Sequence, residues 1–250
     1  MRRARAALRL LRAVVHGVHG LLIVVFAFPR LDASQRHARI RAWSLGMLRS
    51  LGIGLQTHGE PASGGSLLAS NHVSWLDIMA IHAVVPSARF VSKADVGAWP
   101  LVSRLVDAAG TLYLERERKR DALRVVHAMA SALQQGQTVA IFPEGTTSTG
   151  HGLLPFHANL LQAAISTATP VQPVALRYSD ATHAVSLAAE FVGATTLLES
   201  LWQTACGEAM VVRLVFLPPV ASTGADRRAL AGRLRDDIGA ALQILQPARP

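Results

Sequence analysis

The chain has 250 residues, enough to bury one substantial core with a small appendage. It carries 25 basic and 16 acidic side chains, a formal net charge of +9, and half of its residues are hydrophobic. That apolar content is high for a soluble enzyme and low for a multi-span membrane protein, and the positive charge suits an anionic partner. The single cysteine, Cys206, excludes an internal disulfide and a metal site built from cysteines.

The N-terminal segment is basic and then apolar. Five arginines precede an almost wholly apolar run of about 16 residues, 13–28. A basic start before an apolar run resembles a secretion signal, but no small-residue cleavage site follows. The run is also shorter than the roughly 20 residues that span a bilayer comfortably. We therefore expect a retained anchor that dips into the cytoplasmic leaflet with its arginines at the lipid headgroups. A buried helix of the domain and a cleaved signal are the alternatives.

A second helix is predicted over residues 34–51, where apolar positions alternate with four arginines. This pattern fits a helix with a basic face that lies on a membrane surface, or an ordinary helix that packs on the core. Gly52 and Gly54 end it, and residues 53–58 form a first strand candidate before a turn. We expect residues 1–58 to be a helical membrane-anchoring segment and residues 59–250 to be an α/β domain.

From Ser66 onward, short apolar runs alternate with helical patterns. This alternation predicts an α/β fold with a mostly parallel central sheet flanked by helices. The strands are expected at 66–69, 88–92, 111–114, 138–142, 171–177 and 210–217, and the helices at 74–85, 100–109, 118–135, 157–167, 195–204 and 225–245. The basic residues do not form a recognisable nucleic-acid module, so nucleic acid is not expected as a partner.

A histidine and a carboxylate stand close together in the stretch Asn71-His72-Val73-Ser74-Trp75-Leu76-Asp77, where a strand is expected to end and a helix to begin. Imidazole titrates near pH 6.5, so a small shift makes His72 a base at neutral pH. A carboxylate bonded to one ring nitrogen fixes the tautomer and stabilises the cation. This dyad has no nucleophile of its own, so the substrate would supply the hydroxyl. The alternative is a buried histidine with a structural hydrogen bond.

Three further charged residues follow strand candidates. Glu144 lies in Phe142-Pro143-Glu144-Gly145-Thr146-Thr147-Ser148, whose proline and glycine predict a tight turn. Because ligands bind at the carboxyl ends of parallel strands, Glu144 is expected at the edge of a site, with a capped turn as the alternative. Lys93 and Arg116 each end a strand candidate, and two cations at this edge would hold a phosphate. Solvated surface charge is the alternative for both.

In this order, these stretches resemble the PlsC-type glycerolipid acyltransferases, the lysophosphatidic acid acyltransferase family. The corresponding blocks are N-H-x-x-x-x-D (Asn71, His72, Asp77), G-x-x-x-x-x-R (Gly110 to Arg116), F-P-E-G-T (Phe142 to Thr146) and V-x-P (Val171 to Pro173). The correspondence covers about residues 66–176.

The resemblance implies a membrane-associated O-acyltransferase that moves an acyl chain from acyl-CoA or acyl-acyl carrier protein to the free hydroxyl of a lysolipid. It implies that His72 deprotonates the hydroxyl while Asp77 orients His72. The substrate-binding residues would be Lys93, Arg116, Glu144, Gly145, Thr146 and Thr147. No metal or prosthetic group is required, and an inner-membrane location with the catalytic domain facing the cytoplasm and an anionic membrane surface as partner is expected.

Two positions depart from the family pattern. Thr147 stands where many relatives have arginine, and His157 follows Phe156 where lysine or arginine is frequent. Fewer cations favour a less anionic headgroup. We keep 1-acylglycerol-3-phosphate as the expected acceptor, with a lyso-ornithine lipid or another lysophospholipid as alternatives. A lipid hydrolase that uses Ser70 or Ser74, and a catalytically silent membrane-binding protein, are alternatives of other classes.

Overall fold

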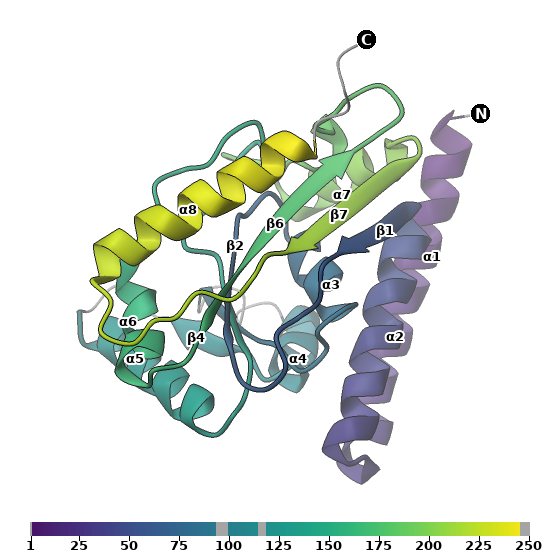
Figure 1. Cartoon of the computed structure of the whole chain (residues 1–250). Coiled ribbons are helices and arrows are strands. Elements are labelled where there is room, and N and C mark those ends of the chain that lie inside the picture. Colours follow the sequence, from purple (N-terminus) through teal and green to yellow (C-terminus); the bar gives the residue numbers. More distant parts are fainter. Residues whose placement is uncertain (1, 94–99, 115–118, 246–250) are drawn as a thin grey trace.

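The computed structural model describes residues 2–93, 100–114 and 119–245 of the chain (Figure 1). In these ranges, seven strands form one sheet in the order β1-β7-β6-β2-β5-β3-β4. The strands are β1 (Ile53–His58), β2 (Leu67–Ser70), β3 (Arg89–Lys93), β4 (Leu112–Leu114), β5 (Val139–Ile141), β6 (Val171–Ser179) and β7 (Met210–Phe216). Neighbouring strands are parallel, except β6 and β7, which are antiparallel. The predicted mostly parallel sheet is confirmed.

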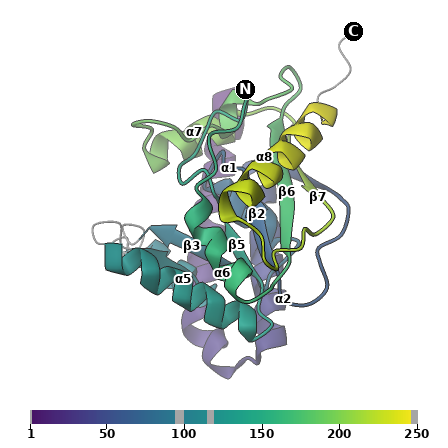
Figure 2. The same ribbon diagram turned by 60° about the vertical axis from the view of Figure 1, so that its left-hand side comes forward.

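Helices cover both faces of the sheet. They are α1 (Arg2–Leu22), α2 (Ala33–Leu51), α3 (Leu76–His82), α4 (Pro100–Ala108), α5 (Lys119–Gln134), α6 (Gln162–Ser166), α7 (Leu197–Cys206) and α8 (Arg227–Ile244). Leu51 of α2 and Ile81 of α3 share one buried apolar cluster with β2, β6 and β7. Met129 of α5 and Leu234 of α8 belong to a second cluster against the sheet. Figure 2 shows α5, α6 and α8 in front of the sheet and α1 and α2 behind it.

β6 is buried along its whole length because both of its faces are covered. Val174, Leu176 and Tyr178 belong to the cluster that contains α3, whereas Ala175 packs against α8. Successive side chains of a strand point to opposite faces, so this alternation follows from the strand itself. It directs the Tyr178 side chain toward α3.

The N-terminal helix is longer than the apolar run in the sequence. α1 continues through a π-helical turn, η1 (Ile23–Ala27), and a 3-10 turn, η2 (Phe28–Arg30), before the chain reverses. Among the described residues, one helix, Arg3–Arg30, is long and apolar enough to cross a membrane by length and composition. The apolar side chains exposed on it are Leu8, Leu11, Val14, Val15, Val18, Leu22, Val25 and Phe26. The apolar run alone is short for a transmembrane helix, but the helix that contains it is long enough to cross a bilayer.

α2 packs closely against α1 through a reciprocal pair of hydrogen bonds. His16 Nε2 lies 2.8 Å from the backbone oxygen of Trp43, and Trp43 Nε1 donates to the backbone oxygen of His16 at 3.0 Å. Gly20 and Gly46 permit this approach, because a Cβ at either position would overlap the Trp43 or His16 ring. The other side of α2 packs on the core, so of its two predicted roles the core-packing helix is observed, with arginines exposed on its outer face.

β1 lies at one edge of the sheet and pairs with β7 along its whole length, from Ile53 with Met210 to His58 with Val215. Residues 53–58 were assigned to the anchoring segment in the prediction, but this pairing, together with the burial of Ile53, makes them part of the sheet. The last helical residue before the sheet is Leu51. The division into functional units at residue 58 stays a prediction.

Two predicted helices differ from the observed ones by more than two residues at an end. The helix expected at 74–85 is the shorter α3. At its start, the Asp77 side chain accepts the backbone N–H groups of Val73 and Ser74, which lie before the first helical residue; its last helical residue is His82. The segment expected to be helical at 157–167 is a 3-10 turn, η4 (Ala158–Leu161), followed by α6. His157 is extended there, since its N–H donates to the Pro143 oxygen.

Candidate active site

His72 and Asp77 form a hydrogen-bonded pair just beyond the end of β2. β2 ends at Ser70, a short turn follows, and Asp77 lies in the first turn of α3. The Nδ1 atom of His72 lies 2.8 Å from Oδ2 of Asp77. The Asp77 side chain is fully buried, whereas the His72 side chain keeps 18% of its surface exposed. The structure thus brings together the two residues that were predicted to form a dyad.

Among the described residues, four groups donate hydrogen bonds to the Asp77 carboxylate, the first being the His72 ring. Oδ2 also accepts the backbone N–H groups of Val73 at 2.7 Å and Ser74 at 3.0 Å, and Oδ1 accepts the Tyr178 hydroxyl at 2.8 Å. Burial, followed by the charge of Asp77, raises the pKa of Tyr178 well above its ordinary value, so its hydroxyl remains a donor. These contacts hold the carboxylate in one orientation and compensate its negative charge.

The same contacts assign the tautomer of His72. Because Asp77 accepts from Nδ1, this nitrogen carries the proton, and Nε2 of the neutral ring is left as an acceptor. Among the described residues, none is hydrogen-bonded to Nε2. The imidazole lies flat on the Phe142 ring, with the ring centroids 3.9 Å apart and the planes inclined by 8°. The ring is therefore fixed in both tautomer and plane, with a proton-accepting nitrogen at its free end.

The turn after β5 holds the backbone of His72. Glu144 is 2% exposed; its Oε1 accepts the His72 N–H at 2.8 Å and its Oε2 accepts the Leu154 N–H at 2.9 Å. The Ser148 N–H donates to the His72 oxygen at 2.8 Å. Burial raises the pKa of Glu144, and the two hydrogen bonds to backbone N–H groups partly oppose this effect. Glu144 thus contacts the main chain of His72, and its predicted part in binding the acceptor stays a prediction.

Two other residues shape this edge of the sheet. The Asn71 side chain pairs with the backbone of Leu176: Nδ2 donates to the oxygen at 2.9 Å and Oδ1 accepts the N–H at 2.8 Å. This fixes the end of β2 against β6. Gly145 has φ of 69°, in the left-handed region that favours glycine, and its N–H closes the turn onto the Phe142 oxygen at 3.0 Å. Both residues give the dyad a rigid frame.

The remaining predicted site residues are distributed around this frame. Thr146 is exposed, and the Thr147 hydroxyl donates to the backbone oxygen of Phe191. Lys93 is the last residue of β3, beside the end of β4, so its backbone lies at the strand-end edge of the sheet. Arg116 lies outside the described residues. His157, which takes the place of a frequent cation, is exposed.

Tyr178 is a site residue that the sequence prediction missed. It lies 101 positions from Asp77 in the chain, so no local spacing relates them. The available signal was the alternation along the strand predicted at 171–177, because Val174 and Leu176 are apolar core positions and the next residue on that face is a tyrosine. A tyrosine at such a position needs a partner for its hydroxyl.

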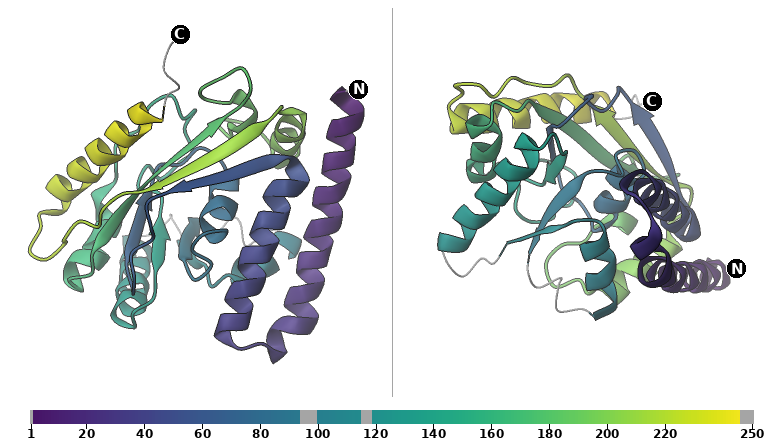
Figure 3. Two further views of the ribbon diagram at one scale, coloured as in Figure 1. Left: turned by 45° about the vertical axis from the view of Figure 1, so that its right-hand side comes forward. Right: turned by 90° about the horizontal axis from the view of Figure 1, so that it is seen from below.

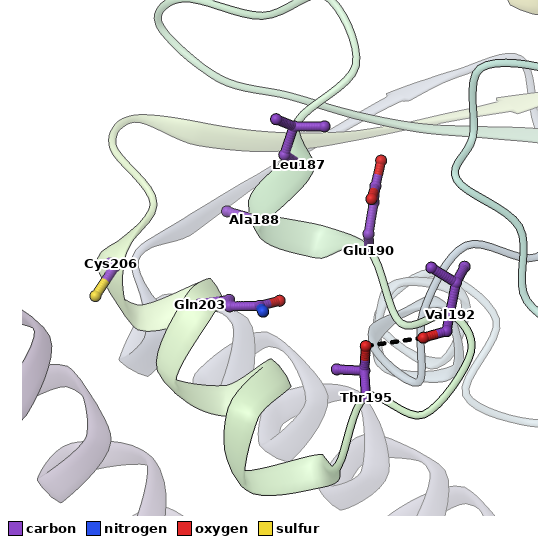
Figure 4. A pocket seen from close by; sticks show the side chains of 7 residues that line it. All are labelled: Leu187, Ala188, Glu190, Val192, Thr195, Gln203 and Cys206. Carbon is purple, nitrogen blue, oxygen red and sulfur yellow. Dashed lines mark hydrogen bonds between the residues drawn. The ribbon is translucent and has the colours of Figure 1, made fainter.

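A hollow of about 490 Å³ lies on the side of α7, between this helix and the 3-10 turn η5 (Leu187–Ala189) (Figure 4). It is lined by Leu187, Ala188, Glu190, Val192, Thr195, Gln203 and Cys206. Phe191, between two of these residues, links it to the dyad: its N–H donates to the Val73 oxygen at 3.3 Å and its oxygen accepts the Thr147 hydroxyl. In the described ranges, no group of three or more His, Cys, Asp or Glu side chains is arranged to hold a metal ion.

Comparisons with known proteins agree with this arrangement. The family model described as Acyltransferase matches residues 55–177. The 1-acyl-sn-glycerol-3-phosphate acyltransferase of Neisseria meningitidis serogroup B is 39% identical over 201 residues, which cover 78% of this chain and 77% of the relative. The lyso-ornithine lipid O-acyltransferase of Pseudomonas aeruginosa is 35% identical over 215 residues, 86% of this chain and 82% of the relative.

Among solved structures, the fold is similar to the crystal structure of the 1-acyl-sn-glycerophosphate (LPA) acyltransferase, PlsC, from Thermotoga maritima. The TM-score is 0.73 at 20% sequence identity, and the match covers 100% of this chain and 99% of the other. At this identity the likeness shows a shared fold, and it includes the N-terminal helices as well as the sheet.

Proposed function

Because this chain belongs to the PlsC-type family of glycerolipid acyltransferases, we propose that it transfers an acyl chain from a thioester to the free hydroxyl of 1-acylglycerol-3-phosphate, forming phosphatidic acid. The donor is acyl-CoA or acyl-acyl carrier protein, and no metal or prosthetic group takes part. The observation that carries this proposal is the His72–Asp77 contact, which leaves one ring nitrogen ready to accept a proton.

In the proposed mechanism, Nε2 of His72 takes the proton of the acceptor hydroxyl as its oxygen attacks the thioester carbon. Asp77 keeps the ring oriented and stabilises the imidazolium that forms. Collapse of the tetrahedral intermediate breaks the carbon–sulfur bond. The departing thiolate of CoA or the carrier then takes the proton back from His72, so the enzyme returns to its starting state.

The acceptor headgroup is assigned to the strand-end edge around the dyad. Lys93 and Arg116 are the cations proposed to bind the phosphate, since Lys93 is the last residue of β3 and Arg116 comes shortly after β4 in the sequence. Gly145, Thr146 and Thr147 would line the acceptor side of the turn, and Glu144 would brace it. These assignments rest on position and on the family resemblance.

A lyso-ornithine lipid is the second candidate acceptor. Thr147 brings no positive charge to a position where many relatives have arginine, and its hydroxyl is already engaged with the Phe191 oxygen. The relative from Pseudomonas aeruginosa carries that activity in its name at nearly the same identity. A zwitterionic headgroup needs fewer cations than a phosphate monoester does.

We also assign the enzyme to the cytoplasmic face of the inner membrane, bound to anionic lipid. The exposed apolar side chains of α1 supply a hydrophobic surface, and the exposed Arg3, Arg5 and Arg12 lie on the same helix. Basic side chains next to an apolar helix favour anionic headgroups and cytoplasmic retention.

The decisive assay offers the purified enzyme 1-acylglycerol-3-phosphate, lysophosphatidylethanolamine and lyso-ornithine lipid, each with labelled acyl-CoA and labelled acyl carrier protein. We expect diacylated product, and a loss of about 100-fold or more in turnover for His72→Ala. Free fatty acid as the main product with and without a lysolipid would instead indicate a hydrolase. Unchanged turnover in His72→Ala would contradict the proposed mechanism.

A further inference from the structure

α7 presents an apolar face that the described fold leaves uncovered. Leu198 is 79% exposed and Trp202 is 42% exposed, and the two side chains lie one helical turn apart on the same face. The opposite face is anchored in the protein, where Ser200 and Thr204 are buried. Trp75 Nε1 donates to the Ser200 hydroxyl at 3.1 Å. The exposed pair therefore lies on a helix of fixed orientation.

The C-terminal end of α7 lies beside α1. Arg9 of α1 donates to the backbone oxygens of Ala205, at 3.0 Å, and Gly207, at 2.5 Å, where α7 ends. Arg5 also pairs with Glu208. Figure 1 places α7 and α1 on the same side of the sheet, and the right-hand view in Figure 3, which is seen from below, shows the same neighbourhood. The two helices that carry exposed apolar side chains are thus neighbours on one side of the sheet.

We propose that α7 is a second membrane-contacting helix, whose Leu198 and Trp202 insert into the boundary between headgroups and acyl chains of an anionic phospholipid bilayer next to α1. Tryptophan favours this depth because its ring is apolar and its N–H is polar. Glu199 and Gln203 flank the pair and are exposed, so the insertion is shallow, as for an amphipathic helix that lies in the interface.

The charges near α7 fit such a surface. The Glu199 carboxylate, next to Leu198, is already engaged by the backbone N–H and the hydroxyl of Thr196 in a capping box, which lowers its pKa. On the α1 side, the exposed Arg3 and Arg12 are available to anionic headgroups. The arginines of the neighbouring helix α1, next to an apolar pair, match an anionic bilayer better than a neutral one.

The same contact sets the position of the catalytic pair relative to the lipid. The segment between η5 and α7 reaches the dyad through Phe191, whose N–H and oxygen bind Val73 and Thr147. Leu187, which lines the hollow from η5, across from α7 in Figure 4, is 55% exposed. Two membrane contacts, α1 and α7, would fix the tilt of the domain and with it the position of His72 relative to the bilayer. This consequence for catalysis rests on the proposed function.

The first test places an environment-sensitive fluorophore on Leu198→Cys in a Cys206→Ser background. Vesicles of phosphatidylethanolamine and phosphatidylglycerol should increase and blue-shift the emission, and lipids with a quencher on the acyl chain should reduce it. The matched control is Ile244→Cys on α8, which is 84% exposed on the other face of the sheet. The proposal is overturned if the label at 198 is unquenched in vesicle-bound protein, or if its signal follows protein concentration without vesicles, which would indicate a second copy on this face.

The second test compares lipid presentations for the Leu198→Glu/Trp202→Glu enzyme. Affinity for anionic vesicles should fall about 10-fold or more, because two apolar insertions are lost. Activity on acceptor in vesicles should fall with it, whereas activity on acceptor in detergent micelles should stay within about twofold of wild type. Leu123→Glu, at a 62% exposed position on α5, is the control and should change neither. Equal losses in vesicles and micelles would overturn the proposal. Absence of transferase activity in wild type would instead count against the proposed function, while the fluorophore result would still stand.

Discussion

The Tyr178 hydroxyl donates to Oδ1 of Asp77 across 2.8 Å, joining the end of β6 to the first turn of α3. Both side chains are buried, so neither group has water as an alternative partner. Asp77 therefore receives the tyrosine on one oxygen and His72 on the other. The orientation of the proposed general base, His72, therefore depends on β6, the strand that pairs with β2.

Tyr178→Phe should remove this support without changing the size of the side chain much. Because Asp77 Oδ1 then lacks a donor in a buried site, the free energy of unfolding should fall by about 1–3 kcal/mol. We expect kcat to fall about tenfold, equivalent to about 1.4 kcal/mol of transition-state stabilisation, with the acceptor KM within a factor of about two. Steady-state kinetics and denaturant unfolding measure the two effects. A raised KM at unchanged kcat would contradict a role in orienting the dyad.

Glu144→Gln should change how stability depends on pH. Burial is the largest influence and raises the pKa of Glu144 in the folded protein. Its favourable contribution is therefore complete below the unfolded-state pKa, about 4.3, and is lost as pH rises through the higher folded-state pKa. The wild type should lose stability over this range, and the variant should lack that part of the slope. The free energy of unfolding of both proteins is measured between pH 4 and 8. The same pH dependence in wild type and variant would contradict a raised pKa for Glu144.

Glu199→Gln provides a control of opposite sign. The capping hydrogen bonds from Thr196 lower the pKa of Glu199, so its contribution is present above the unfolded-state pKa and is lost as pH falls through the folded-state pKa. The difference in stability between wild type and this variant should therefore grow as pH rises from acid toward neutrality. The same unfolding measurements test this direction, and a difference that shrinks as pH rises would contradict a lowered pKa for Glu199.

Thr147→Arg should shift acceptor preference toward the phosphate monoester. A guanidinium at this position adds charge-assisted hydrogen bonds, which are worth about 1.5–3 kcal/mol each. We expect the ratio of kcat/KM for 1-acylglycerol-3-phosphate over lyso-ornithine lipid to rise about tenfold. Thr147→Val, which also loses the hydrogen bond to Phe191 but adds no charge, is the matched control. A similar ratio in both variants would rule out the charge at residue 147 as a determinant.

Gly46→Leu should separate α1 from α2. A side chain here would overlap the His16 ring, and overpacking of this kind costs about 1–3 kcal/mol. We expect faster proteolysis of the connection between the two helices and a lower melting temperature. Gly17→Leu is the control, because nothing lies within 4 Å of a Cβ added there. Equal protease sensitivity of the two variants would contradict the close packing at Gly46.

The parts of the fold that were predictable are local. His72 and Asp77 are separated by less than two helical turns, and the change from an apolar strand to a helical pattern sits between them, so their contact follows from short-range geometry. The mostly parallel sheet likewise follows from the alternation of strand and helix patterns. The acyltransferase assignment needed the order of four separate blocks, because the spacing of the dyad alone occurs often by chance.

The parts that were not predictable depend on contacts between distant segments. Tyr178 meets Asp77 only because β6 lies next to β2, and strand order is not encoded in any single strand. The Glu144 carboxylate was expected to face a ligand, and its contact with the His72 backbone became visible only once β5 was placed beside β2. β1 was grouped with the helices before it because its partner, β7, comes from the other end of the chain.

That pairing has a consequence for how the protein is made. A chain leaves the ribosome from its N-terminus, so α1, α2 and β1 appear long before Met210, the residue that pairs with Ile53. Until then β1 has no strand beside it, and the apolar side chains of α1 are free to meet a membrane during synthesis. The sheet closes at this edge only after β7 has been made, so the membrane attachment that we propose for α1 would precede completion of the sheet.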